Sequence, residues 1–230
     1  MLMYYPGNKN IQGLIQKIVN QIPPCTDFYE LFAGTAAVST FLYRGSRVPP
    51  IFHINDLDPY VTDNFVYPAG SIVTNLPATD IIQSLSSLPA ARTTFIFIDP
   101  PYHHDTRPHN KELYKFEMRH TDHVELLSSV QDLKCNCMII HPECELYDDM
   151  LKHFRTVQIK VRYHDKTSIE NLYMNYQEPA KLLTYVGAGK DCWDRQRIKR
   201  KGDRLVNKLL SLPDVERNYI LNRLSSSFIN

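Results

Sequence analysis

The sequence lacks long apolar runs and any regular arrangement of cysteines. None of its 230 residues belongs to a stretch near the roughly 20 apolar residues that a membrane helix needs. The first ten residues, MLMYYPGNKN, also lack the apolar core of a secretion signal. Five cysteines at irregular spacing argue against a set of disulfide bonds and fit a reducing compartment. We therefore expect a cytoplasmic protein with no membrane partner.

Composition and charge place few other limits on the chain. Hydrophobic residues make up 43% of it, which is enough for a continuous core, and its length fits one α/β domain with a small appendage. The formal net charge of +1 says nothing about a nucleic-acid partner. Its distribution is uneven, because residues 190–208 hold eight basic side chains against three acidic ones.

Hydrophobic periodicity predicts alternating strands and helices. Strands are expected at 27–32, 51–55, 71–74, 93–98, 135–141, 156–163, 170–176 and 181–186, and helices at 10–22, 35–43, 121–133 and 143–154. Such alternation predicts an α/β fold with a doubly wound, mostly parallel sheet. The short loop between the strands that follow residue 155 predicts an antiparallel edge pair. We expect a catalytic domain over 1–189 and a basic helical extension over 190–230, with a second helix beginning near Pro213.

Two predicted strand ends carry residues that could bind a ligand. The turn Phe32–Ala36 is built from small residues, so its backbone could approach a ligand at a helix N-terminus. It lacks the G-x-G-x-x-G of a dinucleotide site, and an ordinary strand–helix turn explains it equally well. Asp56 closes the next strand and could accept hydrogen bonds from ribose hydroxyls. The alternative is that Asp56 or Asp58 caps a helix.

The most specific segment is Asp99-Pro100-Pro101-Tyr102, which follows a strand that is apolar on both faces. Such a strand is expected at the centre of a parallel sheet, and ligands bind at the carboxyl ends of its strands. An aromatic amine is a weak nucleophile because its lone pair is delocalised into the ring. A carboxylate and a backbone carbonyl that accept its two N–H bonds would stabilise the positive charge that develops on nitrogen. The alternative is a proline loop with a capping Asp and a surface Tyr.

These segments, in this order, resemble the Dam-type DNA adenine methylases. Residues 5–9 (Tyr-Pro-Gly-Asn-Lys) are similar to the family's N-terminal cofactor motif, and Phe32–Ala36 to its F-x-G-x-G loop, with Ala36 in place of the last glycine. Asp56 lies where the family has its ribose-binding acid. Residues 99–102 match the catalytic tetrad, and 172–176 resemble the late strand beneath the target base.

The resemblance covers most of residues 4–176 and implies a Rossmann-like methyltransferase. The cofactor would be S-adenosylmethionine, bound by residues that share these motifs: Tyr5, Lys9, Phe32, Gly34, Asp56 and Asp99. The catalytic residues would be Asp99, Pro100, Pro101 and Tyr102. The partner would be double-stranded DNA, with the target adenine flipped out so that its N6 amine attacks the methyl group directly.

One departure from the family concerns sequence recognition. Larger Dam-type enzymes carry a long recognition insertion before the catalytic strand, whereas here only 23 residues separate Asn75 from Asp99. Sequence reading must then come from elsewhere, and the candidates are the loop His103–His120 and the basic tail after Gly189. Five tail residues suit phosphate contacts: Arg195, Arg197, Lys199, Arg200 and Lys201. A solvated helix face is the alternative.

Other functions remain open. A related methyltransferase could act on cytosine N4 or on RNA, and a silent relative could bind DNA without catalysis. Histidines are frequent between His103 and His123, but only His120 and His123 have helical ligand spacing and no cysteine or carboxylate set completes them. We therefore expect no metal.

Overall fold

The structure is a computed structural model that describes residues 9–11, 13–87, 93–107, 112–163 and 166–227. The chain divides into two compact units, the first ending at Val186 and the second beginning at Gly187. Tyr5, predicted to bind the cofactor, lies outside the described residues. Within those residues, no helix is both long and apolar enough to cross a bilayer.

A seven-stranded sheet in the order β3-β2-β1-β4-β5-β7-β6 forms the first unit. The strands are β1 (Asp27–Leu31), β2 (Ile51–Asn55), β3 (Ile72–Thr74), β4 (Thr94–Ile98), β5 (Asn136–Pro142), β6 (Arg155–Tyr163) and β7 (Lys166–Met174). β1 to β5 are parallel, whereas β7 runs antiparallel to both β5 and β6. This arrangement confirms the predicted doubly wound, mostly parallel sheet with an antiparallel edge pair.

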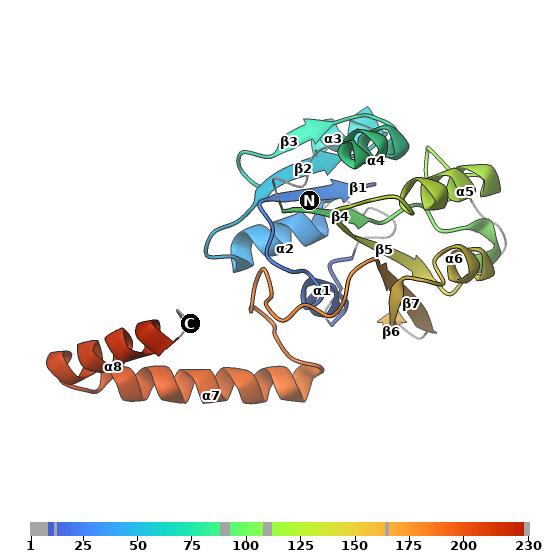
Figure 1. Cartoon of the computed structure of the whole chain (residues 1–230). Helices are drawn as coiled ribbons and strands as arrows, with labels where there is room; N and C mark the ends of the chain where they lie inside the picture. Colours follow the sequence, from blue (N-terminus) through green and yellow to red (C-terminus); the bar gives the residue numbers. More distant parts are fainter. Residues whose placement is uncertain (1–8, 12, 88–92, 108–111, 164–165, 228–230) are drawn as a thin grey trace. The chain divides into compact units, whose positions relative to one another are not determined.

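Helices cover both faces of this sheet (Figure 1). The helices of the first unit are α1 (Leu14–Val19), α2 (Ala37–Gly45), α3 (Pro59–Asn64), α4 (Ala78–Ser86), α5 (His120–Ser129) and α6 (Glu145–Met150), with a 3-10 turn η1 (His104–Thr106). α1 and α2 pack on one face, and α4, α5 and α6 pack on the other. The result is a three-layer α/β/α domain.

Strand β4 shows why the sheet is buried on both faces. Phe95 and Phe97 point into the core under α1 and α2, whereas Ile96 and Ile98 point into the core under α4, α5 and α6. All four side chains are 0% exposed. Burying such a side chain stabilises the fold by about 1.5–3 kcal/mol. The apolar run therefore fixes β4 at the centre, with Asp99 directly after its last residue.

Several sequence predictions differ from the structure. The helices predicted at 121–133 and 143–154 end earlier, at Ser129 and Met150, and α3 and α4 were not predicted. Two further differences have a clear physical cause. The first helix begins at Leu14 rather than near residue 10. Gly13 has a left-handed φ of 95°, so the helical backbone does not extend to the residues before Leu14. The strand predicted at 181–186 is wrong. Leu183 N–H donates to the Ile22 carbonyl (2.9 Å), and Thr184 Oγ1 donates to the Gly45 carbonyl (2.7 Å). This apolar segment therefore bonds to the segment after α1 and to the last residue of α2 instead of the sheet.

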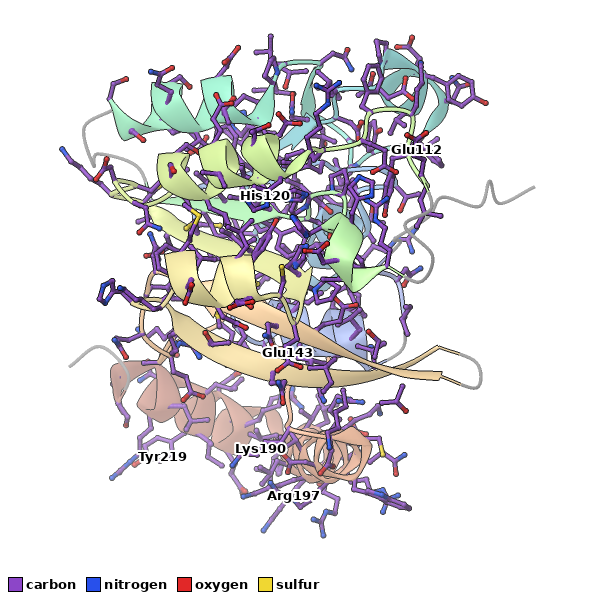
Figure 2. All side chains as sticks on the ribbon, turned by 90° about the vertical axis from the view of Figure 1, so that its right-hand side faces the viewer. Glu112, His120, Glu143, Lys190, Arg197 and Tyr219 are labelled. Atoms are coloured by element: carbon purple, nitrogen blue, oxygen red, sulfur yellow. The ribbon has the colours of Figure 1, made fainter. Side chains whose placement is uncertain are left out.

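The second unit is a pair of helices, α7 (Cys192–Leu210) and α8 (Asp214–Ser227). Figure 2 labels Arg197 on α7 and Tyr219 on α8. Asp191 caps α7 by accepting a hydrogen bond from Asp194 N–H (2.8 Å). No described residue within either helix is buried, so this unit has no core of its own. The predicted helical extension is confirmed.

Candidate functional site

A cavity of about 390 Å³ lies at the carboxyl ends of the central strands. The strand order reverses between β1 and β4, because the chain moves outward through β2 and β3 and then returns to β4. Ligands bind at such a switch point in open α/β sheets. Residues after three strands line the cavity: Phe32 and Gly34 after β1, Asp56 after β2, and Asp99 and Pro101 after β4.

The turn after β1 has an unusual backbone. Phe32, Gly34 and Ala36 all have left-handed φ values, of 57°, 49° and 47°. Only glycine adopts this region without cost, so the two side chains at Phe32 and Ala36 are held there by the surrounding structure. Strained backbone of this kind is concentrated at ligand sites, and this turn lines the cavity.

Glu30 supports this turn from inside the sheet. Its carboxylate accepts hydrogen bonds from the backbone N–H groups of Val38 (3.3 Å) and Ser39 (2.7 Å) in the first turn of α2. Burial raises the pKa of Glu30 to about 7, even though the bonds from Ser39 and Val38 favour the ionised form. Glu30 also lines the cavity, so a carboxyl group whose pKa is raised by burial borders it.

Asp56 and Asp58 have different roles, which the sequence left open. Asp58 caps α3 by accepting a hydrogen bond from Tyr60 N–H (3.0 Å). Asp56 does not cap a helix: its two oxygens accept from Gly34 N–H (2.9 Å) and Asp58 N–H (3.0 Å). Burial raises the pKa of Asp56, and these two bonds oppose that effect. Asp56 thus connects the turns after β1 and β2 while it lines the cavity.

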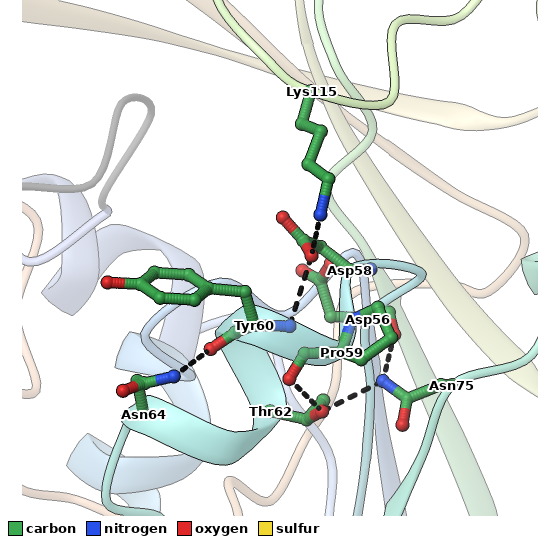
Figure 3. Close-up of polar contacts among 8 residues, drawn as sticks. All are labelled: Asp56, Asp58, Pro59, Tyr60, Thr62, Asn64, Asn75 and Lys115. Carbon is green, nitrogen blue, oxygen red and sulfur yellow. Dashed lines mark hydrogen bonds and ion pairs between the residues drawn. The ribbon is translucent and has the colours of Figure 1, made fainter.

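Side-chain amides and a lysine fix the backbone around these acids (Figure 3). Asn75 donates to the Asp56 carbonyl (2.9 Å) and to Thr62 Oγ1 (2.8 Å). Lys115 Nζ lies 2.9 Å from Asp58 Oδ1, although its own side chain is 63% exposed. The loop that carries Lys115 therefore meets the segment between β2 and α3 through an ion pair whose lysine is exposed.

Asp99 forms a buried ion pair with Lys9. Lys9 Nζ lies 2.7 Å from Asp99 Oδ1, with side-chain exposures of 3% for the lysine and 16% for the aspartate. Burial raises the pKa of Asp99, and the Lys9 ammonium lowers it in part. The contact engages one carboxylate oxygen of Asp99, and both residues line the cavity.

Tyr102 is held by contacts from three other segments. Its hydroxyl donates to both carboxylate oxygens of Glu170, each at 3.0 Å. Lys9 Nζ lies 5.0 Å from the centre of its ring, and the His141 ring meets it edge to face at 5.5 Å. The predicted tetrad is therefore fixed at both ends, by Lys9 at Asp99 and by Glu170 at Tyr102.

Part of the cavity wall comes from residues 113–118, within the loop that we predicted as a candidate for reading the DNA sequence. This part of the loop lines the cavity. Arg107 and Glu117 pair through two parallel hydrogen bonds of 2.7 Å. Glu117 also accepts from the N–H of Tyr114 (2.9 Å). Burial raises the pKa of Glu117, but the bonds from Arg107 and Tyr114 outweigh it and lower the pKa to about 2.

Some of the predicted site residues line the cavity, whereas Pro100 and Tyr102 are not among its lining residues. Lys9, Phe32, Gly34, Asp56, Asp99 and Pro101 all line the cavity. The basic residues predicted to bind phosphate lie on α7: Arg195, Arg197, Lys199, Arg200 and Lys201. The sequence did not single out Glu30 and Glu117, which line the cavity, or Arg107 and Glu170, which bond to Glu117 and Tyr102. Residues 172–176, which resemble the family's late strand, begin opposite Ile140 and continue toward the start of β5, away from the carboxyl edge of the sheet. Glu170 pairs with Pro142 at the carboxyl end of β5 and therefore lies nearer the site.

The histidines near the tetrad bond to one another and to a tyrosine. His103 Nε2 lies 3.1 Å from His120 Nδ1, and His123 Nδ1 lies 2.8 Å from the Tyr147 hydroxyl. His120 begins α5 and is labelled in Figure 2. Among the residues that the structure describes, no group of three His, Cys, Asp or Glu side chains could hold a metal ion.

The sequence matches no protein-family profile and no curated protein. Similar solved structures include TrmK of M. capricolum in complex with S-adenosyl-homocysteine, at 9% identity and a TM-score of 0.46, covering 94% of this chain and 95% of that one. Human methyltransferase-like protein 13, also with that product, has 16% identity and a TM-score of 0.42, covering 80% and 84%. The Dnmt2 methyltransferase of S. pombe has 11% identity and a TM-score of 0.42, covering 66% and 50%. Similarity at this level assigns no activity to the chain.

Proposed function

We propose that this protein is a methyltransferase that transfers a methyl group from S-adenosylmethionine to the N6 amine of a flipped-out adenine in double-stranded DNA. The observation that carries the proposal is the buried Lys9–Asp99 pair at the end of the central strand, which lines the same cavity as Asp56. The matching order of the motifs in the Dam-type family supports the choice of adenine and DNA.

The cavity residues fit the chemistry of S-adenosylmethionine. The volume of about 390 Å³ lies within the range of small-molecule sites. Asp56 offers carboxylate oxygens that could accept from ribose hydroxyls, and the turn at Gly34 brings the backbone close to the same place. Leu57 and Pro77 supply apolar surface for a base. When bound, the cofactor supplies a methyl group on a sulfonium, which is already an activated leaving group.

The residues of the tetrad would act on the target amine. Lys9 holds Oδ1 of Asp99, so Oδ2 is the oxygen assigned to one N–H of the adenine amine. The Pro100 carbonyl would accept the second N–H. Both acceptors stabilise the positive charge that develops on nitrogen during attack. Tyr102 would stack on the flipped base, and the proton would leave to water after transfer.

The pH dependence of activity should change when Lys9 is removed. The Lys9 ammonium lowers the pKa of Asp99, so Lys9→Met should raise that pKa and move the acidic limb of the kcat profile to higher pH. Lys9→Arg keeps the charge and should leave the limb near its wild-type position. Profiles of methyl transfer between pH 4 and 8 would measure this, and an unmoved limb in Lys9→Met would contradict the role of Lys9.

The substrate class can be tested with a panel of nucleic acids. The protein is incubated with S-adenosylmethionine carrying a labelled methyl group and with unmethylated duplex DNA, single-stranded DNA or RNA hairpins. We expect label on duplex DNA in clear excess over RNA. Label on RNA alone would replace the DNA proposal with an RNA methyltransferase, and cofactor binding without transfer to any substrate would indicate a silent relative.

We propose that α7 binds DNA phosphates. Arg197 and Lys199 are exposed but pair with Asp194 (2.6 Å) and Asp203 (2.7 Å), so part of the positive charge is neutralised within the helix. Replacing Arg197, Lys199 and Arg200 with Ala should reduce the slope of log affinity against log salt by about 0.9 for each phosphate that the variant no longer neutralises. Arg223→Ala on α8 is the matched control. A triple variant with the wild-type slope would exclude binding of DNA by α7.

A further inference from the structure

Glu170 is a buried carboxylate outside the predicted tetrad, and the mechanism proposed above gives it no role. It lies in β7, it is 1% exposed, and it pairs in register with Pro142 of β5. Burying an ionised carboxylate is costly unless hydrogen bonds compensate for the lost water. Both oxygens of Glu170 accept from the Tyr102 hydroxyl at 3.0 Å. A short neutral polar side chain at this position would avoid the free-energy cost of burying a charge, so the carboxylate of Glu170 needs an explanation.

The direction of β7 brings Glu170 to the site. β7 runs antiparallel to β5, so its first half reaches the carboxyl edge of the parallel strands, where Asp99 and Tyr102 lie. The Tyr102–Glu170 contact therefore joins residues that are 68 positions apart in the chain. It fixes the far end of the Tyr102 side chain from a rigid strand rather than from a loop.

His141 holds the backbone that follows Tyr102. Its Nδ1 lies 2.8 Å from the Pro142 carbonyl, so Nδ1 carries the proton and donates. Its Nε2 then accepts from His103 N–H at 2.9 Å. Burial lowers the pKa of His141 to about 3, which keeps the ring neutral and this acceptor available at neutral pH. Tyr102 is thus fixed through its backbone by His141 and through its hydroxyl by Glu170.

We propose that Glu170 is a positioning residue that sets the plane of the Tyr102 ring for stacking on the target base; this inference rests on the proposed function. Without the Glu170 acceptor, the Tyr102 ring keeps its contacts with Lys9 and His141 but loses the one that holds its hydroxyl end, so its plane is less restricted and its stacking on the base is weaker. A misplacement of about 1 Å at a reacting group can lower the rate about 100-fold. The cofactor cavity does not include Glu170, so binding of S-adenosylmethionine should be unaffected.

A double-mutant cycle tests this inference. Tyr102→Phe removes the donor and keeps the ring, Glu170→Ala removes the acceptor, and the double variant removes both. We expect each single variant to lower kcat on duplex DNA by about 10- to 100-fold, with the Kd for S-adenosylmethionine unchanged. The double variant should lose no more than the worse single variant, because the two residues act as one unit.

Two further variants separate positioning from general destabilisation. Glu170→Gln keeps an acceptor for the Tyr102 hydroxyl and should retain kcat within about threefold of wild type. Glu178→Ala, an exposed residue beyond β7, should behave as wild type. Thermal unfolding of each variant identifies those that do not fold. If Glu170→Ala does not fold, the test is the kcat of Glu170→Gln compared with that of wild type.

The outcomes are distinct. Non-additive losses in kcat with rescue by Gln would support the inference. Additive losses, wild-type kcat in Glu170→Ala, an effect confined to cofactor binding, or Glu170→Gln as inactive as Glu170→Ala would overturn it while leaving the proposed function intact. A wild-type protein that binds S-adenosylmethionine but methylates no nucleic acid would overturn the proposed function, and this inference with it.

Discussion

Replacing Asp99 with alanine is expected to lower kcat for methyl transfer by about 100- to 1,000-fold, because the amine loses an acceptor aimed at its developing positive charge. The variant also leaves Lys9 buried without the carboxylate that lies 2.7 Å away. Asp99→Asn should be nearly as inactive, since an amide accepts a hydrogen bond but carries no negative charge. Initial rates on duplex DNA at saturating cofactor would measure both variants.

Asp63→Ala is the matched control for Asp99. Asp63 is an exposed aspartate in α3, and its removal should leave kcat unchanged. An Asp99→Ala protein that folds and methylates DNA at the wild-type rate would show that the catalytic carboxylate has been misassigned.

Arg107→Met should lower the free energy of unfolding by about 3 kcal/mol or more, because it leaves the Glu117 carboxylate largely buried without its cation. The pair is bidentate, and its side chains are 3% and 15% exposed. The pKa of Glu117 is lowered to about 2 from 4.5, so its ionised form stabilises the fold above pH 4.5 and this contribution is lost as the pH falls toward 2. The difference in unfolding free energy between wild type and Arg107→Met should therefore become smaller at acidic pH.

The control for this prediction is another ion pair on the same loop. Lys115→Met breaks the pair with Asp58, but Lys115 is 63% exposed, so the expected loss is below about 1 kcal/mol. Urea unfolding of the three proteins at pH 7 and pH 4 gives the comparison. Equal, small losses in both variants would contradict the claim that Arg107 and Glu117 hold the cavity wall.

We also expect weaker cofactor binding in Arg107→Met, because residues 113–118 line the cavity.

The sequence predicted most of the sheet because its strands are defined by local patterns. The run that became β4 is apolar on both faces, and Asp99-Pro100-Pro101-Tyr102 follows it directly, so the centre of the sheet and its main acidic residue could be located together. The segment 181–186 shows the limit of this reasoning. An apolar run predicts a strand, but here its hydrogen bonds go to Ile22, after α1, and to Gly45, at the end of α2.

The missed site residues depend on contacts between distant segments. Glu170 sits within a strand of mixed polarity, and only the antiparallel register of β7 against β5 brings it to Tyr102. Arg107 and Glu117 lie in a loop whose sequence gives no sign of a buried ion pair. Local sequence patterns carry no information about such contacts between distant segments. The Asp99 motif could be found because the catalytic residues directly follow the end of their strand in the chain.

The most direct test of the proposed activity is to identify the methylated nucleoside by mass after wild-type protein, S-adenosylmethionine and unmethylated duplex DNA are incubated together and the DNA is digested. We predict N6-methyladenine as the product. Methylated cytosine, or unmodified DNA from a protein that binds the cofactor, would contradict the proposed activity.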